Sequence, residues 1–225
     1  MTLTATTFPG LDPLLQSGVI AVVRLTEAVR LGPAARALAA GGVGAVEVTL
    51  TTPGAIDAIA DLASDQGLAG CVIGAGTVLD ESAARSVIDA GARFVVSPAL
   101  DPSVIRACRD RAVPCMPGAF TPTELLEAWR AGAPVVKLFP ASAVGSAYIR
   151  DVLAPLPFLR LVPSGGVSLE NAGDWIRAGA AAVSVGGALA SAVLLAEGSA
   201  AELTARARSF VERVAEARRH RGKTP

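Results

Sequence analysis

Lys137 is the residue whose surroundings most clearly favour chemistry. It is one of two lysines and lies inside the apolar run Val135–Pro140, whereas Lys223 lies in the charged C-terminal tail. Arginine supplies the rest of the 20 basic residues, so lysine is not used here as a general surface residue. Burial disfavours the charged ammonium form, and a neutral lysine amine can attack a carbonyl and form a Schiff base. A structural ion pair with a buried carboxylate is the alternative.

Glu47 is a second charged residue inside an apolar, strand-like segment, Ala45–Leu50. Side chains alternate along a strand, so Glu47 and Thr49 share one face and the apolar residues share the other. The same alternation places Lys137 and Phe139 on one face of their own segment. We therefore expect Glu47 and Lys137 to face the same interior. A buried ion pair seldom repays its desolvation, which favours a functional reason for the two charges.

The elements that must position these residues alternate between short β-branched runs and helical stretches. Ser, Thr or Asp stands at the helix starts, often before Pro, and Gly stands at several helix ends. The expected strands are Val19–Arg24, Ala45–Leu50, Cys71–Thr77, Phe94–Pro98, Pro114–Gly118, Val135–Pro140, Arg160–Gly165 and Ala182–Gly186. Eight strand–helix units predict an α/β protein, a (β/α)8 TIM barrel. An open doubly wound sheet is the alternative, but no Gly-rich turn follows the first strand.

The chain is expected to form a single domain over residues 1–225. The barrel core covers about residues 18–190. A short extra helix, Leu11–Ser17, precedes the first strand, and a C-terminal, arginine-rich amphipathic helix covers about residues 200–218. This length is ordinary for one α/β barrel with a large core.

Composition excludes several classes of function. The formal net charge is +0 and aromatics are 4% of the chain, which argues against nucleic acid as a partner. Three cysteines, Cys71, Cys108 and Cys115, support neither a disulfide scaffold nor a zinc site. The only histidine, His220, lies in the tail, so we expect no Ser-His-Asp site and no metal. No segment resembles a leader or a membrane span, so we expect a soluble, cytoplasmic protein.

The carboxyl ends of barrel strands are where active sites form. There, the Thr77 hydroxyl suits a carboxylate or carbonyl oxygen, and Arg24 is placed to pair with an anion. Glycine turns follow the seventh and eighth strands, where barrels often bind phosphate through backbone N–H groups. These turns contain Ser164, Gly165, Gly166, Gly186 and Gly187. The alternative is that these are tight turns that merely need glycine.

Taken in order, the strand-end motifs resemble those of a known enzyme family. The motifs are Glu47-Val-Thr-Leu, Gly74-Ala-Gly-Thr-Val-Leu, Ser97-Pro98, Pro117-Gly118, Val136-Lys137-Leu-Phe-Pro-Ala and Pro163-Ser-Gly-Gly-Val. They resemble the 2-keto-3-deoxy-6-phosphogluconate aldolases, which include bifunctional 4-hydroxy-2-oxoglutarate aldolases. The resemblance runs over about residues 18–190. It implies a homotrimeric class I aldolase of the Entner-Doudoroff pathway, without metal or cofactor, that releases pyruvate and an aldehyde (glyceraldehyde 3-phosphate or glyoxylate).

The resemblance also implies a role for each matching residue. Lys137 would form the Schiff base, and Glu47 would act as general acid and base, through a water. The expected carboxylate and pyruvyl-binding residues are Thr77, Arg24, Thr49 and Thr51. The expected pocket wall is Pro98, Pro117 and Phe139. The expected phosphate-binding residues are Ser164, Gly165, Gly166, Gly186 and Gly187.

Three positions depart from the family pattern. Thr51 stands where members commonly have an arginine that binds the substrate carboxylate, so that task falls to Thr77, Arg24 or backbone amides. Ser164 replaces a threonine and keeps the hydroxyl. Ala188 stands where some members have a serine, which removes one phosphate donor.

These departures leave alternatives open. The substrate could be the galactonate analogue or another 2-keto-3-deoxy acid. A phosphosugar isomerase or epimerase barrel could use Glu47 as a base without a covalent step. A barrel that binds a phosphometabolite without turning it over is the third alternative.

Overall fold

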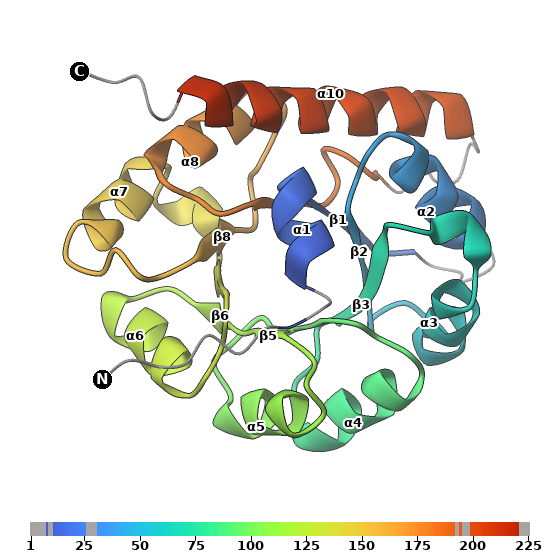
Figure 1. Cartoon of the computed structure of the whole chain (residues 1–225), viewed down its shortest axis with the longest axis horizontal. Helices are drawn as coiled ribbons and strands as arrows, with labels where there is room; N and C mark the ends of the chain where they lie inside the picture. Colours follow the sequence, from blue (N-terminus) through green and yellow to red (C-terminus); the bar gives the residue numbers. More distant parts are fainter. Residues whose placement is uncertain (1–7, 9–10, 26–30, 192–193, 195–198, 221–225) are drawn as a thin grey trace.

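A computed structural model describes residues 8, 11–25, 31–191, 194 and 199–220. Parallel strands form the inside of the molecule and helices surround them (Figure 1). The short helix α1 (Leu11–Ser17) has the expected bounds and lies over the middle of this ring. Because α1 leads directly into the first strand, it covers the N-terminal ends of the strands.

The strands form two parallel sheets. The larger is a curled sheet of six strands in the order β5-β4-β3-β2-β1-β9, and the smaller has the order β6-β7-β8. The larger contains β1 (Val19–Val23), β2 (Ala45–Thr49), β3 (Val72–Gly76), β4 (Val95–Val96), β5 (Cys115–Met116) and β9 (Val183–Val185). The smaller contains β6 (Gly118–Ala119), β7 (Val136–Leu138) and β8 (Leu161–Pro163). The prediction of an α/β fold is confirmed.

The strand boundaries differ from the expected ones. The fifth expected strand, Pro114–Gly118, is divided into β5 and β6 at Pro117, because proline has no N–H for a strand ladder. The carbonyl of Pro117 still accepts a hydrogen bond from the Lys137 N–H at 2.9 Å. An isolated parallel bridge, Ser164 to Ser184, joins the two sheets on their other side. The ends of the expected strands turn into loops, and these loops carry the strand-end residues.

The helices lie outside the sheets, where the sequence places them. Their bounds are α2 (Leu31–Ala40), α3 (Ala55–Ala63), α4 (Glu81–Asp89), α5 (Pro102–Asp110), α6 (Pro122–Arg130), α7 (Ala147–Leu153), α8 (Ala172–Ala178) and α10 (Ala200–His220), with 3-10 turns η2 (Gln66–Leu68) and η3 (Ala141–Ala143). Asp80, Asp101 and Thr121 cap α4, α5 and α6 through their side chains, as expected at these starts. Thr121 and Glu124 complete a capping box.

Apolar side chains fill two regions. One lies between the sheets and the helices, and the other fills the interior enclosed by the strands. The interior cluster includes Leu11 and Leu14 of α1 together with Ile20, Phe94 and Met116 from the strands. The N-terminal end of the interior is therefore closed by packed side chains, and a cavity can open only at the carboxyl ends of the strands.

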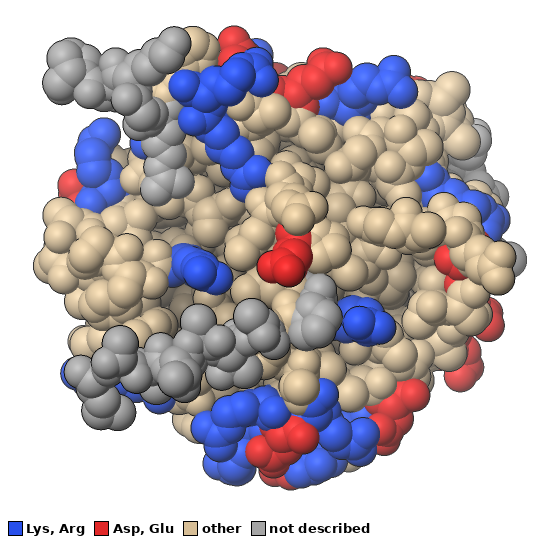
Figure 2. Space-filling model, in the orientation of Figure 1, with Lys and Arg blue, Asp and Glu red and all other residues tan. Residues whose placement is uncertain are grey.

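The surface carries charges of both signs. Basic and acidic side chains are interspersed around the rim of the face shown in Figure 2. In the part of this face that the structure describes, they form no continuous basic stripe of the kind that tracks a nucleic-acid backbone. None of the described helices is both long and apolar enough to span a membrane.

Arg218 of α10 ties the N-terminal end of the fold together. Its guanidinium donates hydrogen bonds to the carbonyls of Gln16 at 2.6 Å, Leu15 at 2.7 Å and Ala181 at 2.8 Å. Two of these carbonyls end α1, where unpaired carbonyl groups favour a cation. The side chain thus joins α10 to α1 and to the segment before β9.

Arg218→Ala should lower the free energy of unfolding by about 2 kcal/mol, because it removes charge-assisted hydrogen bonds to backbone carbonyls. Urea unfolding measures this change. Arg219→Ala, at the exposed next position, is the matched control and should change stability by less than about 0.5 kcal/mol. Equal effects of the two variants would show that the Arg218 contacts do not stabilise the fold.

Candidate active site

A cavity of about 650 Å³ opens at the carboxyl ends of the strands. Eleven of the fourteen residues that the sequence singles out line it. These are Arg24, Glu47, Thr77, Pro98, Lys137, Phe139, Ser164, Gly165, Gly166, Gly186 and Gly187. They come from seven different strands or the loops that follow them, so the sheet topology brings distant parts of the sequence to one site.

Lys137 lies in the middle of β7 and is 7% exposed. In register, Gly118 of β6 lies on one side of it and Val162 of β8 on the other. Its Nζ lies 4.8 Å from the centroid of the Phe139 ring, the next side chain on the same face. Lys137 is thus fixed between two neighbouring strands, and its amine is buried at the cavity.

Glu47 lies in β2, where all five residues are buried, and is itself 1% exposed. Its carboxyl group occupies the space that the missing side chain of Gly76 leaves on β3, since a Cβ at Gly76 would overlap it. The Glu47 Oε2 atom is buried without a hydrogen-bond partner among the described residues. The glycine of the Gly-Ala-Gly-Thr motif therefore makes room for a carboxyl group that only a ligand or a water can satisfy.

Burial raises the pKa of the Glu47 carboxyl above its ordinary value near 4.5. The charges of Lys137 and, more weakly, Arg24 oppose this rise. The ion pairs of the described residues all join partly exposed side chains, and none of them connects Glu47 to Lys137. Glu47 can thus carry a proton at a higher pH than an exposed glutamate, as a general acid must.

Arg24 and Thr77 lie at the rim of the cavity. Arg24 follows β1 directly and is exposed, and Thr77 follows β3 directly. Thr77 has a φ of 60°, a left-handed conformation that is uncommon for residues other than glycine. Such conformations cluster at functional sites, where the surrounding structure holds them in place.

The glycine turns form the other end of the cavity. Gly166 has a φ of 74°, and a Cβ there would lie 2.7 Å from Cβ of Ser142, so the backbone itself requires glycine. Gly187 differs, because its φ is not positive and a Cβ would meet nothing within 4 Å. The N–H groups of Gly165, Gly166 and Gly187 donate to no acceptor among the described residues. Free N–H groups on converging turns suit an anion.

Three predicted site residues do not line the cavity. Thr49 is buried at the end of β2, and its hydroxyl lies 2.9 Å from the hydroxyl of exposed Thr51. Because β2 ends at Thr49, the chain turns away before either threonine reaches the cavity. Pro117 is buried where β5 and β6 separate. Ala188 does line the cavity and brings no hydroxyl to it.

The structure also adds residues that the sequence reasoning missed. They are Val22, Val167, Ser168, Ser184 and Ala190. Ser184 is 1% exposed, and its Oγ is, like Glu47 Oε2, buried without a partner among the described residues. Ser184 is a polar residue between two valines of a strand, Val183 and Val185. A polar residue inside an apolar strand is also the signal that identifies Glu47 in the sequence.

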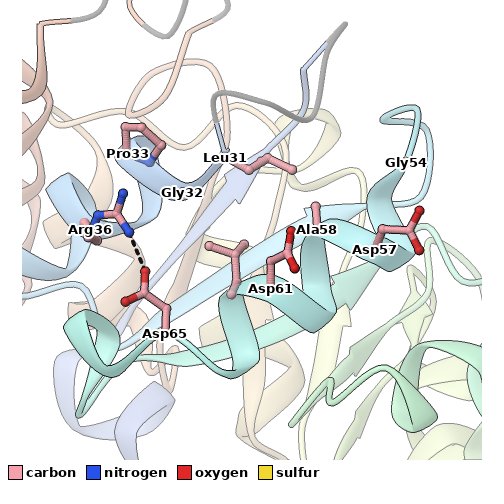
Figure 3. A pocket seen from close by; sticks show the side chains of 10 residues that line it. Leu31, Gly32, Pro33, Arg36, Gly54, Asp57, Ala58, Asp61 and Asp65 are labelled. Carbon is pink, nitrogen blue, oxygen red and sulfur yellow. Dashed lines mark hydrogen bonds and ion pairs between the residues drawn. The ribbon is translucent and has the colours of Figure 1, made fainter.

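A second cavity, of about 710 Å³, lies outside the sheet between α2 and α3 (Figure 3). Asp57 and Asp61 of α3 line it, and Arg36 of α2 pairs with Asp65 at 2.6 Å. Its charged groups are solvated, and no lysine lines it. No cluster of His, Cys, Asp and Glu that could hold a metal occurs among the described residues. The cavity that contains Lys137 is therefore the candidate active site.

The raised pKa of Glu47 makes a prediction about stability. The Glu47 carboxyl binds its proton more tightly in the folded chain than in the unfolded chain. Proton binding therefore adds its full contribution to the free energy of unfolding below about pH 4.5, and this contribution is lost as the pH rises through the pKa of the folded state. Glu47→Gln cannot titrate. The original chain should therefore lose stability relative to Glu47→Gln as the pH rises from about 4.5 towards neutrality. Urea unfolding across this range measures the difference, and a pH-independent difference would refute the burial argument.

Comparisons with known proteins agree with this geometry. A family model described as "Aldolase: KDPG and KHG aldolase" matches residues 12–206. The chain is 40% identical over 172 residues to a 2-dehydro-3-deoxy-phosphogluconate aldolase of Treponema pallidum, covering 76% of this chain and 80% of the relative. It is 37% identical over 178 residues to a probable 2-dehydro-3-deoxy-6-phosphogalactonate aldolase of Rhizobium meliloti, covering 79% and 84%.

A solved structure has the same fold. The KDPG aldolase of Legionella pneumophila, with pyruvate captured as a covalent carbinolamine intermediate, superposes with a TM-score of 0.82 at 29% identity. The match covers 91% of this chain and 98% of that one. The family model spans most of the chain and includes every residue of the cavity. This chain therefore belongs to the KDPG and KHG aldolase family, whose members are carbon–carbon lyases.

Proposed function

We propose that this chain is a class I aldolase that cleaves 2-keto-3-deoxy-6-phosphogluconate to pyruvate and glyceraldehyde 3-phosphate through a Schiff base on Lys137. The observation that carries the proposal is the pairing of a buried amine with a buried, unpartnered carboxyl group in one cavity. The Legionella relative, in which pyruvate is held as a carbinolamine, supports the same chemistry. No metal or cofactor is needed for it.

The mechanism follows from the two groups. The neutral amine of Lys137 adds to C2 of the keto acid and forms a carbinolamine. Glu47 then donates a proton to the C2 hydroxyl, which leaves as water. The resulting protonated imine accepts the electrons of the C3–C4 bond as it breaks, while the proton of the C4 hydroxyl passes to the Glu47 carboxylate. The aldehyde then leaves. Protonation of the enamine at C3 and hydrolysis of the imine release pyruvate and restore both side chains.

The two ends of the cavity suit the two ends of this substrate. Thr77, Arg24, Phe139 and Pro98 all line the cavity, which supports the expectation that the first two bind the carboxylate and the last two form the wall beside the reacting carbons. The free N–H groups of the glycine turns suit the phosphate. The family description and the Rhizobium relative point to two further substrates, 4-hydroxy-2-oxoglutarate, which would give glyoxylate, and the galactonate analogue. Because position 51 is a threonine, Arg24 is the only arginine that lines the cavity among the described residues.

We also infer that the two sheets close into one (β/α)8 barrel and that the chain is a single domain. The continuity of β5 and β6 through Pro117 and the Ser164–Ser184 bridge support this closure. Homotrimer formation, as in the family, fits the exposed apolar side chains Ile56 and Leu79, which follow neighbouring strands. Three free cysteines fit the reducing cytoplasm.

Sodium borohydride with pyruvate should trap a covalent adduct on Lys137, because borohydride reduces an imine to a stable amine. Intact-mass and peptide mass spectrometry locate the adduct. Lys137→Arg should form no adduct and should lose aldolase activity at least about 100-fold, since arginine cannot form the imine. Lys223→Arg changes the other lysine and is the matched control, with adduct and activity retained. An active Lys137→Arg enzyme would rule out the proposed function.

Gly187→Ala tests the phosphate end. A Cβ there projects into open space and meets no protein atom, so the fold should be unaffected while a bound phosphate is displaced. KM for the phosphorylated substrate should rise about tenfold, which corresponds to roughly 1.4 kcal/mol of binding free energy. Kinetics with 4-hydroxy-2-oxoglutarate, which has no phosphate, should stay unchanged. An equal loss with both substrates would place the phosphate elsewhere.

A further inference from the structure

Ser184 carries an unexplained hydroxyl at the centre of the proposed active site. The residue is 1% exposed on β9 and lines the cavity, and its Oγ has no hydrogen-bond partner among the described residues. A buried hydroxyl without a partner costs free energy. Alanine would fill the site without this cost, so a serine here indicates that something else binds the hydroxyl.

The strand registers place Ser184 at the same level as Lys137. Lys137 lies opposite Val162, and the bridge from Ser164 to Ser184 puts Val162 opposite Ala182. The position on β9 that lies across from Lys137 is therefore Ala182, and Ser184 comes two residues after it. Barrel strands tilt by about 36° from the barrel axis. Two strands away, the side chain at the same height along this axis is therefore two residues further along its strand.

The same shift leads from Ser184 to Glu47. Ser184 lies opposite Ile20, and Ile20 lies opposite Ala45, two residues before Glu47. Glu47 lies opposite Gly74, and Gly74 lies opposite Phe94, two residues before Val96. Val96 lies opposite Met116, and the β6–β7 register puts Met116 opposite Val135, two residues before Lys137. The four side chains of this layer are Glu47, Val96, Lys137 and Ser184. Four side chains from alternate strands form one layer of a barrel.

The order around this layer decides what Ser184 can do. Glu47 and Lys137 lie opposite each other, with Ser184 between them on one side and Val96 on the other. Val96 is apolar and fully buried, so only the serine side offers a proton path. Among the described residues, two buried side-chain oxygens lack partners, Glu47 Oε2 and Ser184 Oγ, and both belong to this layer.

We propose that Ser184 is a further catalytic residue of the proposed aldolase, and that its hydroxyl relays the proton from Glu47 to the C2 oxygen as the imine forms. In the carbinolamine, Ser184 gives its proton to the C2 hydroxyl and takes one from the Glu47 carboxylic acid. The C2–O bond breaks and its electron pair leaves with water, while the lone pair on the Lys137 nitrogen forms the second C–N bond. The products are the protonated imine, water, an unchanged serine and the Glu47 carboxylate.

The test is the rate of imine formation with pyruvate, followed by rapid mixing, borohydride quenching and mass spectrometry of the full chain. Ser184→Ala should slow this rate at least about tenfold. This is less than the roughly 100-fold or more typical of a lost proton-transfer group, because a water can enter the vacated space. Its urea stability should equal or exceed that of the original chain, since the hydroxyl had no partner. Ser184→Thr, which keeps the hydroxyl, should recover most of the rate.

Ser97→Ala is the matched control. Ser97 is equally buried but does not line the cavity, and its Oγ accepts a hydrogen bond from the Ala99 N–H at 3.3 Å. Ser97→Ala should lose some stability and keep the rate of imine formation, whereas Ser184→Ala should keep its stability and lose rate. A Ser184→Ala enzyme that forms the imine at the original rate would overturn the relay. Lys137→Arg separates the two proposals, because an adduct formed by that variant would overturn the proposed function itself.

Discussion

The site depends on keeping a carboxyl group and an amine out of water in one cavity without letting them neutralise each other. Burial of Glu47 favours its protonated form, and the space beside Gly76 is what admits the side chain to the interior. A direct ion pair would fix both groups in their charged forms, which is the wrong state for an attacking amine and a proton donor. Glu47 on β2 and Lys137 on β7 come from different sheets and line one cavity, and none of the ion pairs of the described residues joins them.

The fold provides this arrangement at a cost that its apolar core must offset. Desolvating two ionisable groups opposes folding by several kcal/mol, whereas the interior below them is packed with apolar side chains. Those side chains and α1 close the N-terminal end. The cavity therefore opens at the carboxyl ends of the strands, where Thr77, Arg24 and the glycine turns line it. Structural residues such as Arg218 act at the closed end, far from the chemistry.

Most of the site could be predicted from the sequence because strand alternation is a strong signal. Glu47 and Lys137 stand out among apolar neighbours, and period-two alternation places both on inward faces. The alternation does not say where a strand ends, so it also directs Thr49 towards the cavity. Thr49 shares a face with Glu47 but lies at the last residue of β2, where its hydroxyl meets Thr51.

Pro117 and Ser184 show two other limits of the sequence. The sequence places Pro117 inside one strand, Pro114–Gly118, whereas in the structure it divides this segment into β5 and β6 and stays buried. The sequence does not single out Ser184, because a small serine between valines resembles a packing residue. Only the registers, which depend on contacts between strands far apart in the sequence, place it in the layer of Glu47 and Lys137.

The central claim is that burial holds the Glu47 carboxyl in its protonated form above the range of an exposed glutamate. Infrared difference spectroscopy, comparing the original chain with Glu47→Gln across pH, isolates the carbonyl stretch of this one carboxylic acid. We expect the protonated band of Glu47 to persist well above pH 4.5 and to disappear only as the pH approaches the raised pKa. Loss of the band at or below pH 4.5 would contradict the account, because the carboxyl would then be an ordinary, solvated one.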